Sequence, residues 1–503
     1  MALKDTDVAE HNTPESCWVT IHGRAYDMTS FVADHPGGPE TILEYAGKDA
    51  TAVYDPIHPS GTLDKYLDPS KHLGPVVSTA NVQAEDETPE DIERQDRIAH
   101  KPLLSQCYNL FDFEVVARRV MKRTSWAYYA SAADNELVGQ TQFFCSSITN
   151  PSQTAQENQR VFQRIWFRPK VLVNVEHVDI STTMLGAKTS IPIYVSATAL
   201  NKLGHPEGEV VFTRASHKHN IIQMIPTLSS CSFDEIIDAR GDGQVQWLQL
   251  YVSKDREATK RVVQAAEERG CKGLCITVDN PQVGRRERQL RSKYTEPADG
   301  QDTNSQGSVR ATSNLLDSTL SWADIPWFQS ITSMPIVIKG VQRVEDVLKA
   351  VEYGCQGVIL SNHGGRQLEF APSSIEVLAE TMPVLRERGL QDKIEVYVDG
   401  GIRRGTDILK ALCLGARGVG IGRAFLYALG SYGQVGVERA IQLLKDELEM
   451  DMRLIGCNRL EELNPSLLSF RGVGDHSAPY ADGLSLAAYD PLTPVPQRNK
   501  AKL

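Results

Sequence analysis

The sequence has little of what marks disulfide-linked, membrane-spanning or nucleic-acid-binding proteins. Only 9 of its 503 residues are cysteine, they are scattered, and no zinc-type spacing joins them. We therefore expect neither a disulfide framework nor a zinc site, and a reducing compartment. No run of about 18 apolar residues occurs, so no transmembrane helix is expected. The net charge of −11 comes without a basic stripe, which argues against nucleic acid and anionic membranes as partners.

Targeting signals are also missing from the first ten residues. They are neither strongly apolar nor rich in arginine, unlike a signal or transit peptide. A cytoplasmic location is therefore the expectation.

Composition divides the chain into four segments. Residues 1–77 are rich in turns, aromatics and histidine, and residues 78–104 form a polar, acidic linker with a helical end. Residues 105–465 carry the main domain, and residues 466–503 form a tail that is extended and proline-rich over 490–502. The polar segment 296–307 is predicted to be a mobile loop near the active face.

Eight short apolar runs alternate with amphipathic stretches in the main domain. The expected strands are 193–197, 221–225, 247–251, 274–279, 335–339, 357–361, 395–399 and 418–422. Glycines at 270, 354 and 415 stand where three of the intervening helices should end. Eight such units in about 250 residues predict an α/β fold of the (β/α)8 TIM-barrel type. An open doubly wound sheet is the structural alternative.

Polar residues stand in or just after the last part of every expected strand, at the end where barrel enzymes hold their chemistry. They are Ala197-Thr198-Ala199, Thr227, Ser229, Gln249, Tyr251, Thr277, Asp279, Arg285, Arg286, Lys339, Ser361 to Arg366, Asp399 to Arg403, and Gly422-Arg423. A single polar side chain of this kind usually forms its hydrogen bonds within its own loop. Repeated at eight strand ends, such groups would converge on one concave face and need a ligand or each other.

The last two of these loops indicate a phosphate site. Asp399-Gly400-Gly401-Ile402-Arg403 and Gly422-Arg423 combine glycines, which let backbone N–H groups approach closely, with arginine charge. Ordinary glycine-rich turns are the alternative. No Gly-x-Gly-x-x-Gly motif opens a helix after an early strand, so a dinucleotide is not expected.

A base and a carboxylate clamp are predicted beside it. His363 precedes two glycines, and Asp279 is placed to orient it as an acid orients a histidine base. Arg366 and Arg286 can bind a carboxylate. These residues predict proton abstraction next to a carboxylate, in an enzyme with a phosphate-bearing cofactor.

The motifs Ser361 to Arg366, Asp399 to Arg403, Gln249 to Val252 and Thr277 to Asp279 resemble those of the FMN-dependent 2-hydroxy acid dehydrogenase family, over roughly residues 105–460. This resemblance implies that Tyr128 and Tyr251 hydrogen-bond the substrate and that Lys339 favours the reduced flavin. The other residues implied to hold FMN are Ala197, Thr198, Ala199, Ser229, Gln249, Thr277, Ser361, Asp399, Gly400, Gly401, Arg403, Gly422 and Arg423.

The N-terminal segment carries two turn-mounted histidines, His35 and His58, among aromatic and apolar residues. Two such histidines can clamp a flat group, and a bis-histidine heme iron has no open coordination site, which suits electron transfer. Residues 3–77 resemble the cytochrome b5 domain, an α+β heme domain. The resemblance implies that His35 and His58 are its axial ligands.

Both domains together resemble heme-linked members of the dehydrogenase family. This implies oxidation of an L-2-hydroxy acid, foremost L-lactate, by FMN, with electrons passing to heme b and then to a cytochrome c-type acceptor. The resemblance also implies a homotetramer. If a presequence is missing from this sequence, the mitochondrial intermembrane space is the alternative to a cytoplasmic location. The alternative functions are a 2-hydroxy acid oxidase that uses oxygen and a non-catalytic heme-binding redox sensor.

Overall fold

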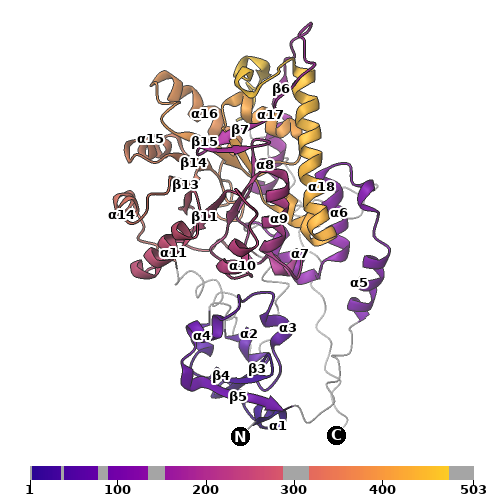
Figure 1. Cartoon of the computed structure of the whole chain (residues 1–503), viewed down its shortest axis with the longest axis vertical. Coiled ribbons are helices and arrows are strands. Elements are labelled where there is room, and N and C mark those ends of the chain that lie inside the picture. Colours follow the sequence, from indigo (N-terminus) through magenta and orange to yellow (C-terminus); the bar gives the residue numbers. More distant parts are fainter. Residues whose placement is uncertain (1–2, 36–38, 78–88, 134–152, 287–315, 475–503) are drawn as a thin grey trace, which may run out of the picture.

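The computed structural model describes residues 3–35, 39–77, 89–133, 153–286 and 316–474. They form a small N-terminal domain and a closed barrel surrounded by helices (Figure 1). The segment 296–307 and the tail 490–502 lie outside the described residues. Every described helix is too short or too polar to cross a lipid bilayer.

The N-terminal domain is built on a five-stranded sheet of order β1-β5-β4-β3-β2. Its elements are β1 (Leu3–Lys4), α1 (Asp5–Ala9), β2 (Asn12–Thr13), β3 (Ser16–Ile21), β4 (Arg24–Asp27), α2 (Glu40–Leu43), α3 (Thr51–Tyr54), α4 (Thr62–Tyr66) and β5 (His72–Val77). Alternate residues of β3, such as Cys17 and Val19, face a core that also contains Tyr26 and Leu67. The first strand pairs in parallel with the last, with Leu3 opposite Val76.

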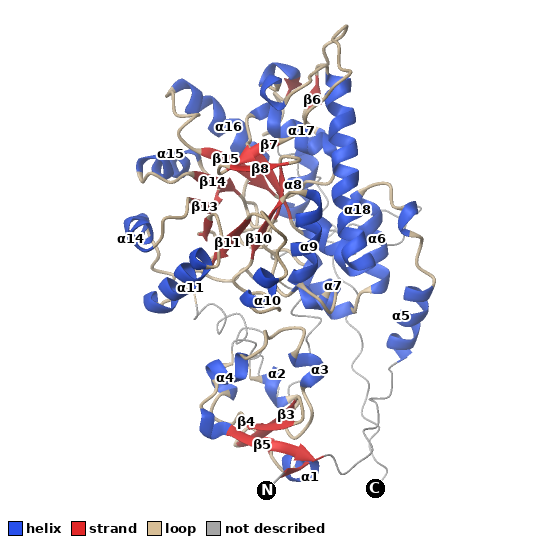
Figure 2. Ribbon diagram, viewed as in Figure 1, coloured by secondary structure: helices blue, strands red, loops and turns tan. Residues whose placement is uncertain are grey.

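The second unit is a closed barrel of eight parallel strands (Figure 2). They are β9 (Ile193–Val195), β10 (Ile222–Ile225), β11 (Gln246–Leu250), β12 (Leu274–Thr277), β13 (Ile336–Val341), β14 (Gly357–Leu360), β15 (Glu395–Asp399) and β16 (Gly418–Ile421). β16 pairs with β9 and closes the barrel. The predicted barrel is therefore confirmed, and the open-sheet alternative is wrong.

A helix follows each barrel strand. In chain order these are α9 (Glu209–His219), α10 (Phe233–Asp238), α11 (Arg256–Glu268), α14 (Ile325–Ile331), α15 (Val344–Glu352), α16 (Ser374–Glu387), α17 (Gly405–Leu414) and α18 (Arg423–Ile455). Gly270, Gly354 and Gly415, predicted to end α11, α15 and α17, all have positive φ. This left-handed backbone terminates the helices at little steric cost because glycine has no Cβ.

Between the N-terminal domain and the barrel, the described residues form the helices α5 (Pro89–Ala99), α6 (Leu110–Val120), α7 (Arg123–Ala130) and α8 (Gln153–Gln163). α6 packs against α18. Arg94 and Arg97 of α5 donate to the carbonyls of Val120 and Arg119 at the end of α6. Part of the predicted linker 78–104 is thus a helix attached to the barrel unit.

One end of the barrel is closed by a hairpin of β7 (Thr182–Met184) and β8 (Ala187–Thr189), which precedes β9. Met184 is buried against Tyr194, Trp247 and Tyr397, whose rings fill the barrel interior. A two-stranded pair of β6 (Trp166–Phe167) and β17 (Leu468–Ser469) lies outside the barrel. Because the hairpin covers the amino ends of the strands, a substrate site belongs at their carboxyl ends.

Candidate active site and heme site

Polar side chains form a layer at the carboxyl ends of β11, β12 and β13. Gln249 donates from Nε2 to Oγ1 of Thr277 at 2.9 Å, and Thr277 stands opposite Lys339 in the strand register. The main-chain N–H of Thr227 donates to Oε1 of Gln249. The parallel strands therefore bring together Gln249, Thr277 and Lys339, three of the residues predicted for the site.

Lys339 stands at the centre of this layer with 5% of its surface exposed. Its Nζ lies 3.6 Å from Asp399 Oδ2 and donates to Ser361 Oγ at 3.3 Å. Burial alone would lower the pKa of Lys339, but the carboxylates of Asp399 and Asp279 outweigh it and raise the pKa above its usual value. The site thus holds a fixed positive charge.

His363 lies between an acid and a phenol. Its Nδ1 is 3.0 Å from Asp279 Oδ1, and its Nε2 is 3.2 Å from the hydroxyl of Tyr251. An ionised carboxylate only accepts hydrogen bonds, so Nδ1 carries the proton and Nε2 is the basic nitrogen. The proton-accepting lone pair therefore points to the side where Tyr251 lies.

The protonation states suit a general base. Burial lowers the pKa of His363, and the raising effect of Asp279 does not cancel it. Burial would raise the pKa of Asp279, but the charges of His363 and Lys339 leave it below its usual value. At neutral pH the pair is therefore a neutral imidazole beside a carboxylate, which stabilises the imidazolium once a proton has been taken.

The backbone around the base requires glycine. His363, Gly364 and Gly365 follow one another with φ of 58°, 64° and 73°, a left-handed backbone that glycine adopts readily and that is uncommon for a residue such as His363. At Gly340 a Cβ would lie 2.6 Å from Cβ of Asp279. Any side chain there would displace the carboxylate that orients His363.

Two arginines, Arg366 and Arg286, lie near His363. Their combined positive charge exceeds the negative charge around them. Arg366 donates to the carbonyl of Tyr128 at 3.1 Å, and its guanidinium lies 5.2 Å from the centre of the Tyr128 ring. Burial and repulsion from Arg286 lower the pKa of Arg366 to about 10. Two like charges held close together in this half-buried site are costly unless an anion is present. The donor set therefore fits a substrate carboxylate.

Arg423 adds a third, half-buried cation. It donates to the carbonyls of Tyr129, Gly364 and Ser131. Burial and repulsion from Arg366 lower its pKa to about 10. A phosphate beside Arg423 would relieve this excess of charge, so the residues fit the anionic end of FMN.

The loop after β15, which is predicted to bind phosphate, packs against α8. α8 covers its glycines: a Cβ on Gly401 would meet the carbonyl oxygen of Asn158. Arg403 forms an ion pair with Glu114 at 2.9 Å. This ion pair uses Nη2 of Arg403, whereas its Nη1 is buried without a hydrogen-bond partner among the described residues and is free to donate to an anion.

Several predicted flavin residues hydrogen-bond within their own loops. Thr198 donates to Asn201 at 3.2 Å, and Ser229 donates to the carbonyl of Cys231 at 2.7 Å. Ala197, Ala199 and Gly422 lie on the loops that follow β9 and β16. These loops surround the same mouth of the barrel as Lys339.

One pair of site residues was missed. Asn158 of α8 and Asn362 exchange amide hydrogen bonds at 2.8 Å, and both are buried. Asn362 also accepts from the N–H of Gly365, so the pair fixes the turn that carries His363. Its place inside the Ser361 to Arg366 motif was the available signal for Asn362, whereas nothing in the sequence marked Asn158.

The N-terminal domain brings His35 and His58 together. Their ring centroids are 6.0 Å apart, and two imidazoles that share one metal ion through bonds of about 2 Å have centroids roughly 6 Å apart. His35 Nδ1 is 3.0 Å from the Thr41 hydroxyl, and His58 Nδ1 donates to the Tyr54 carbonyl at 3.2 Å. Nε2 of each ring is then the nitrogen for the metal.

The surroundings of His58 fit a heme. Burial lowers its pKa and so favours the neutral imidazole that binds iron. The described residues contain no cluster of three or more His, Cys, Asp or Glu side chains suited to a metal ion. A pair of histidines alone suits a metal whose other ligands come from a porphyrin.

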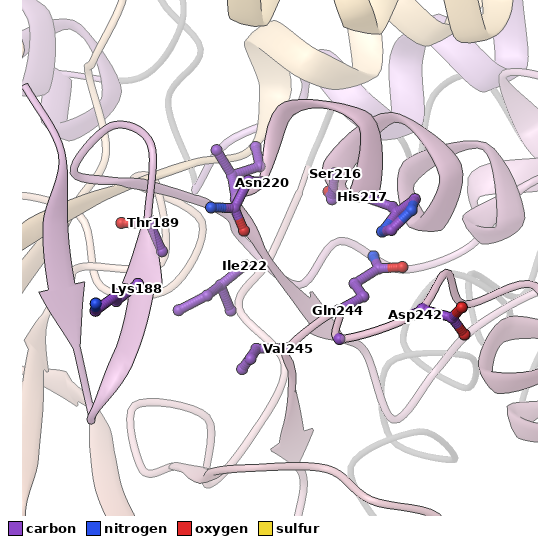
Figure 3. A pocket seen from close by; sticks show the side chains of 11 residues that line it. Lys188, Thr189, Ser216, His217, Asn220, Ile222, Asp242, Gln244 and Val245 are labelled. Carbon is purple, nitrogen blue, oxygen red and sulfur yellow. The ribbon is translucent and has the colours of Figure 1, made fainter.

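A separate cavity of about 230 Å³ lies at the other end of the barrel (Figure 3). Lys188 and Thr189 of β8, Ser216 and His217 of α9, and Val245 are among its lining residues. None of the predicted site residues lines it. The cavity therefore does not belong to the candidate active site.

Comparison with known proteins gives two family matches. Residues 117–470 match the FMN-dependent dehydrogenases, and residues 4–77 match the cytochrome b5-like heme/steroid binding domain. The chain is 54% identical over 479 residues to an L-lactate dehydrogenase (cytochrome) of Wickerhamomyces anomalus, covering 94% of this chain and 81% of that protein. It is 48% identical over 484 residues to the enzyme of that name from Saccharomyces cerevisiae, covering 93% and 79%.

A solved structure of a flavocytochrome b2 variant with pyruvate bound is also similar. Its TM-score is 0.71 at 48% sequence identity, over 78% of this chain and 94% of that one.

Proposed function

This chain belongs to the FMN-dependent dehydrogenase family and also carries a cytochrome b5-like domain, and on that premise we propose that it oxidises L-lactate to pyruvate. The observation that carries the proposal is the His363–Asp279 pair beside Arg366 and Arg286 at the barrel mouth. When bound, FMN accepts the electrons of the oxidised alcohol, and heme b carries them singly to a cytochrome c-type acceptor.

Proton removal falls to His363. Nε2 takes a proton from the substrate, while the carboxylate of Asp279 holds Nδ1–H and stabilises the imidazolium. Tyr251, whose hydroxyl is 3.2 Å from Nε2, orients the substrate on that side. The 2-hydroxy group and the base are thereby held in one geometry, which lowers the entropic part of the barrier.

Substrate binding falls to Arg366 and Arg286, with Tyr128 beside them. Their positive charges select an acid. Burial and repulsion from neighbouring arginines lower the pKa of both residues, and a carboxylate bound there would offset both effects. Lys339, permanently charged at neutral pH, favours added electron density on the flavin. The residues proposed to hold FMN are those assigned above by resemblance, and His35 and His58 are the proposed heme ligands.

An anaerobic visible spectrum with L-lactate tests the function. We expect the flavin band to bleach and the sharp bands of a reduced bis-histidine heme to appear together. Flavin bleaching with an unchanged heme would contradict internal electron transfer and favour the oxygen-dependent alternative. No change with L-lactate, glycolate, mandelate or longer 2-hydroxy acids would contradict the enzymatic proposal itself.

Replacing Arg366 with lysine tests the carboxylate clamp. Lysine keeps the charge but loses the planar fork, so we expect KM for L-lactate to rise roughly 10- to 100-fold, the range for a charged hydrogen bond. Steady-state kinetics at matched flavin content measures this. Arg417→Lys is the control, since Arg417 bonds the Thr183 carbonyl at the other end of the barrel. An unchanged KM in Arg366→Lys would remove the residue from the clamp.

Assembly and location are also proposals. The family resemblance supports a homotetramer, for which sedimentation equilibrium should give four chain masses. We propose the cytoplasm as the compartment, with the mitochondrial intermembrane space as the alternative that cell fractionation would distinguish.

A further inference from the structure

The N-terminal domain is hydrogen-bonded to the barrel through one buried serine. The hydroxyl of Ser230, in the loop after β10, donates to the carbonyl of Pro56 at 2.7 Å. A second, longer contact joins the Ser60 hydroxyl to Glu235 of α10 at 3.5 Å. Figure 1 shows the indigo N-terminal domain beneath α10, in agreement with these contacts.

Ser230 is held rigidly from the barrel side. It is fully buried, its N–H donates to Oε1 of Glu209 at 2.9 Å, and its hydroxyl accepts from the N–H of Lys202 at 3.3 Å. Glu209, also fully buried at the first position of α9, accepts from Asn201 N–H at 3.1 Å and Cys231 N–H at 3.0 Å. One carboxylate therefore joins the loops after β9 and β10 and holds the main chain of Ser230, while the Lys202 N–H orients the Ser230 hydroxyl.

Pro56 is rigidly connected to the proposed heme ligand. The N–H groups of Ile57 and His58 both donate to the Tyr54 carbonyl, and Nδ1 of His58 donates to the same oxygen. The His58 ring also stacks on Tyr54 with centroids 4.3 Å apart. The Pro56 carbonyl and the His58 ring thus belong to one fixed turn, and whatever holds Pro56 also positions His58.

The loop after β10 connects residues assigned to the two proposed cofactor sites. Ser229 is among the residues proposed to contact FMN, and the next residue, Ser230, bonds the turn that carries His58. We propose that Ser230, held by Glu209, is a positioning residue that docks the heme domain on the barrel for electron transfer between the two cofactors. The inference rests on the proposed function, because docking matters for turnover only if electrons pass from flavin to heme.

Ser230→Ala in the full-length holoenzyme tests the proposal. The variant keeps the main-chain N–H that binds Glu209, so the loop should stay in place. In anaerobic stopped-flow with L-lactate we expect an unchanged rate of flavin reduction and a roughly three- to tenfold slower reduction of heme, the factor expected from one hydrogen bond. Ser190→Ala is the matched control, since Ser190 donates to the His219 carbonyl at 2.5 Å at the other end of the barrel.

Hydrogen exchange supplies a readout that does not depend on turnover. Amides of residues 54–60 should exchange faster in Ser230→Ala than in the wild type or Ser190→Ala, because the turn loses its contact with the barrel. Unchanged exchange there, or equal slowing of flavin and heme reduction, would overturn the docking role. If wild-type flavin is not reduced by L-lactate, the proposed function fails, while the exchange measurement still decides whether Ser230 docks the domain.

Discussion

Replacing His363 with glutamine is expected to lower the rate of flavin reduction by L-lactate about 10²- to 10⁴-fold, the contribution typical of a general base. Glutamine keeps hydrogen-bonding atoms near Asp279 and Tyr251 but cannot accept a proton at neutral pH. The loss should fall on the chemical step and leave flavin binding unchanged. Anaerobic stopped-flow absorbance at saturating L-lactate measures it.

The control for this substitution is His217→Gln, which alters an exposed histidine at the opposite end of the barrel. We expect its flavin reduction to match the wild type. A His363→Gln rate within a few-fold of the wild type would show that another group takes the proton.

The second large effect is expected at the heme. Replacing His58 with alanine removes one of two iron ligands, so the bis-histidine spectrum should disappear and cytochrome c reduction should fall to the background rate. Reduction of the flavin by L-lactate should persist, because no residue proposed for proton removal or carboxylate binding lies in the N-terminal domain. The two measurements are a heme spectrum and parallel assays with cytochrome c and a small artificial acceptor.

His11→Ala is the matched control, because His11 stacks on Trp18 in the same domain with ring centroids 3.5 Å apart. Its heme spectrum should be that of the wild type. An intact bis-histidine spectrum in His58→Ala would contradict the ligand assignment.

The barrel and the centre of its site could be predicted because both follow from local patterns. Apolar runs bounded by helix patterns gave all eight strands, and parallel strands necessarily bring their carboxyl ends together. For this reason the pairing of His363 with Asp279, which are 84 positions apart in the chain, was predictable from the sequence. The positive φ of Gly270, Gly354 and Gly415 likewise follows from helix endings that the sequence marks.

The contacts that could not be predicted join segments outside this repeating pattern. Glu114 pairs with Arg403, and Asn158 lies against Gly401. Both partners stand on helices before the barrel, where no periodicity places one residue against another. The Ser230–Pro56 contact is of the same kind, since it depends on how two separately folded units meet and not on the pattern of either one.

The pairing of β1 with β5 has an evolutionary consequence. Because the first and last strands of the N-terminal domain lie side by side, both of its ends emerge at one edge of its sheet. Recombination can add, remove or exchange such a domain as one unit. The barrel strands keep all their neighbours, because the two sheets are separate. The same barrel can thus be inherited with a different electron-accepting domain. Only contacts between the two domains, such as Ser230 with Pro56, would then have to change.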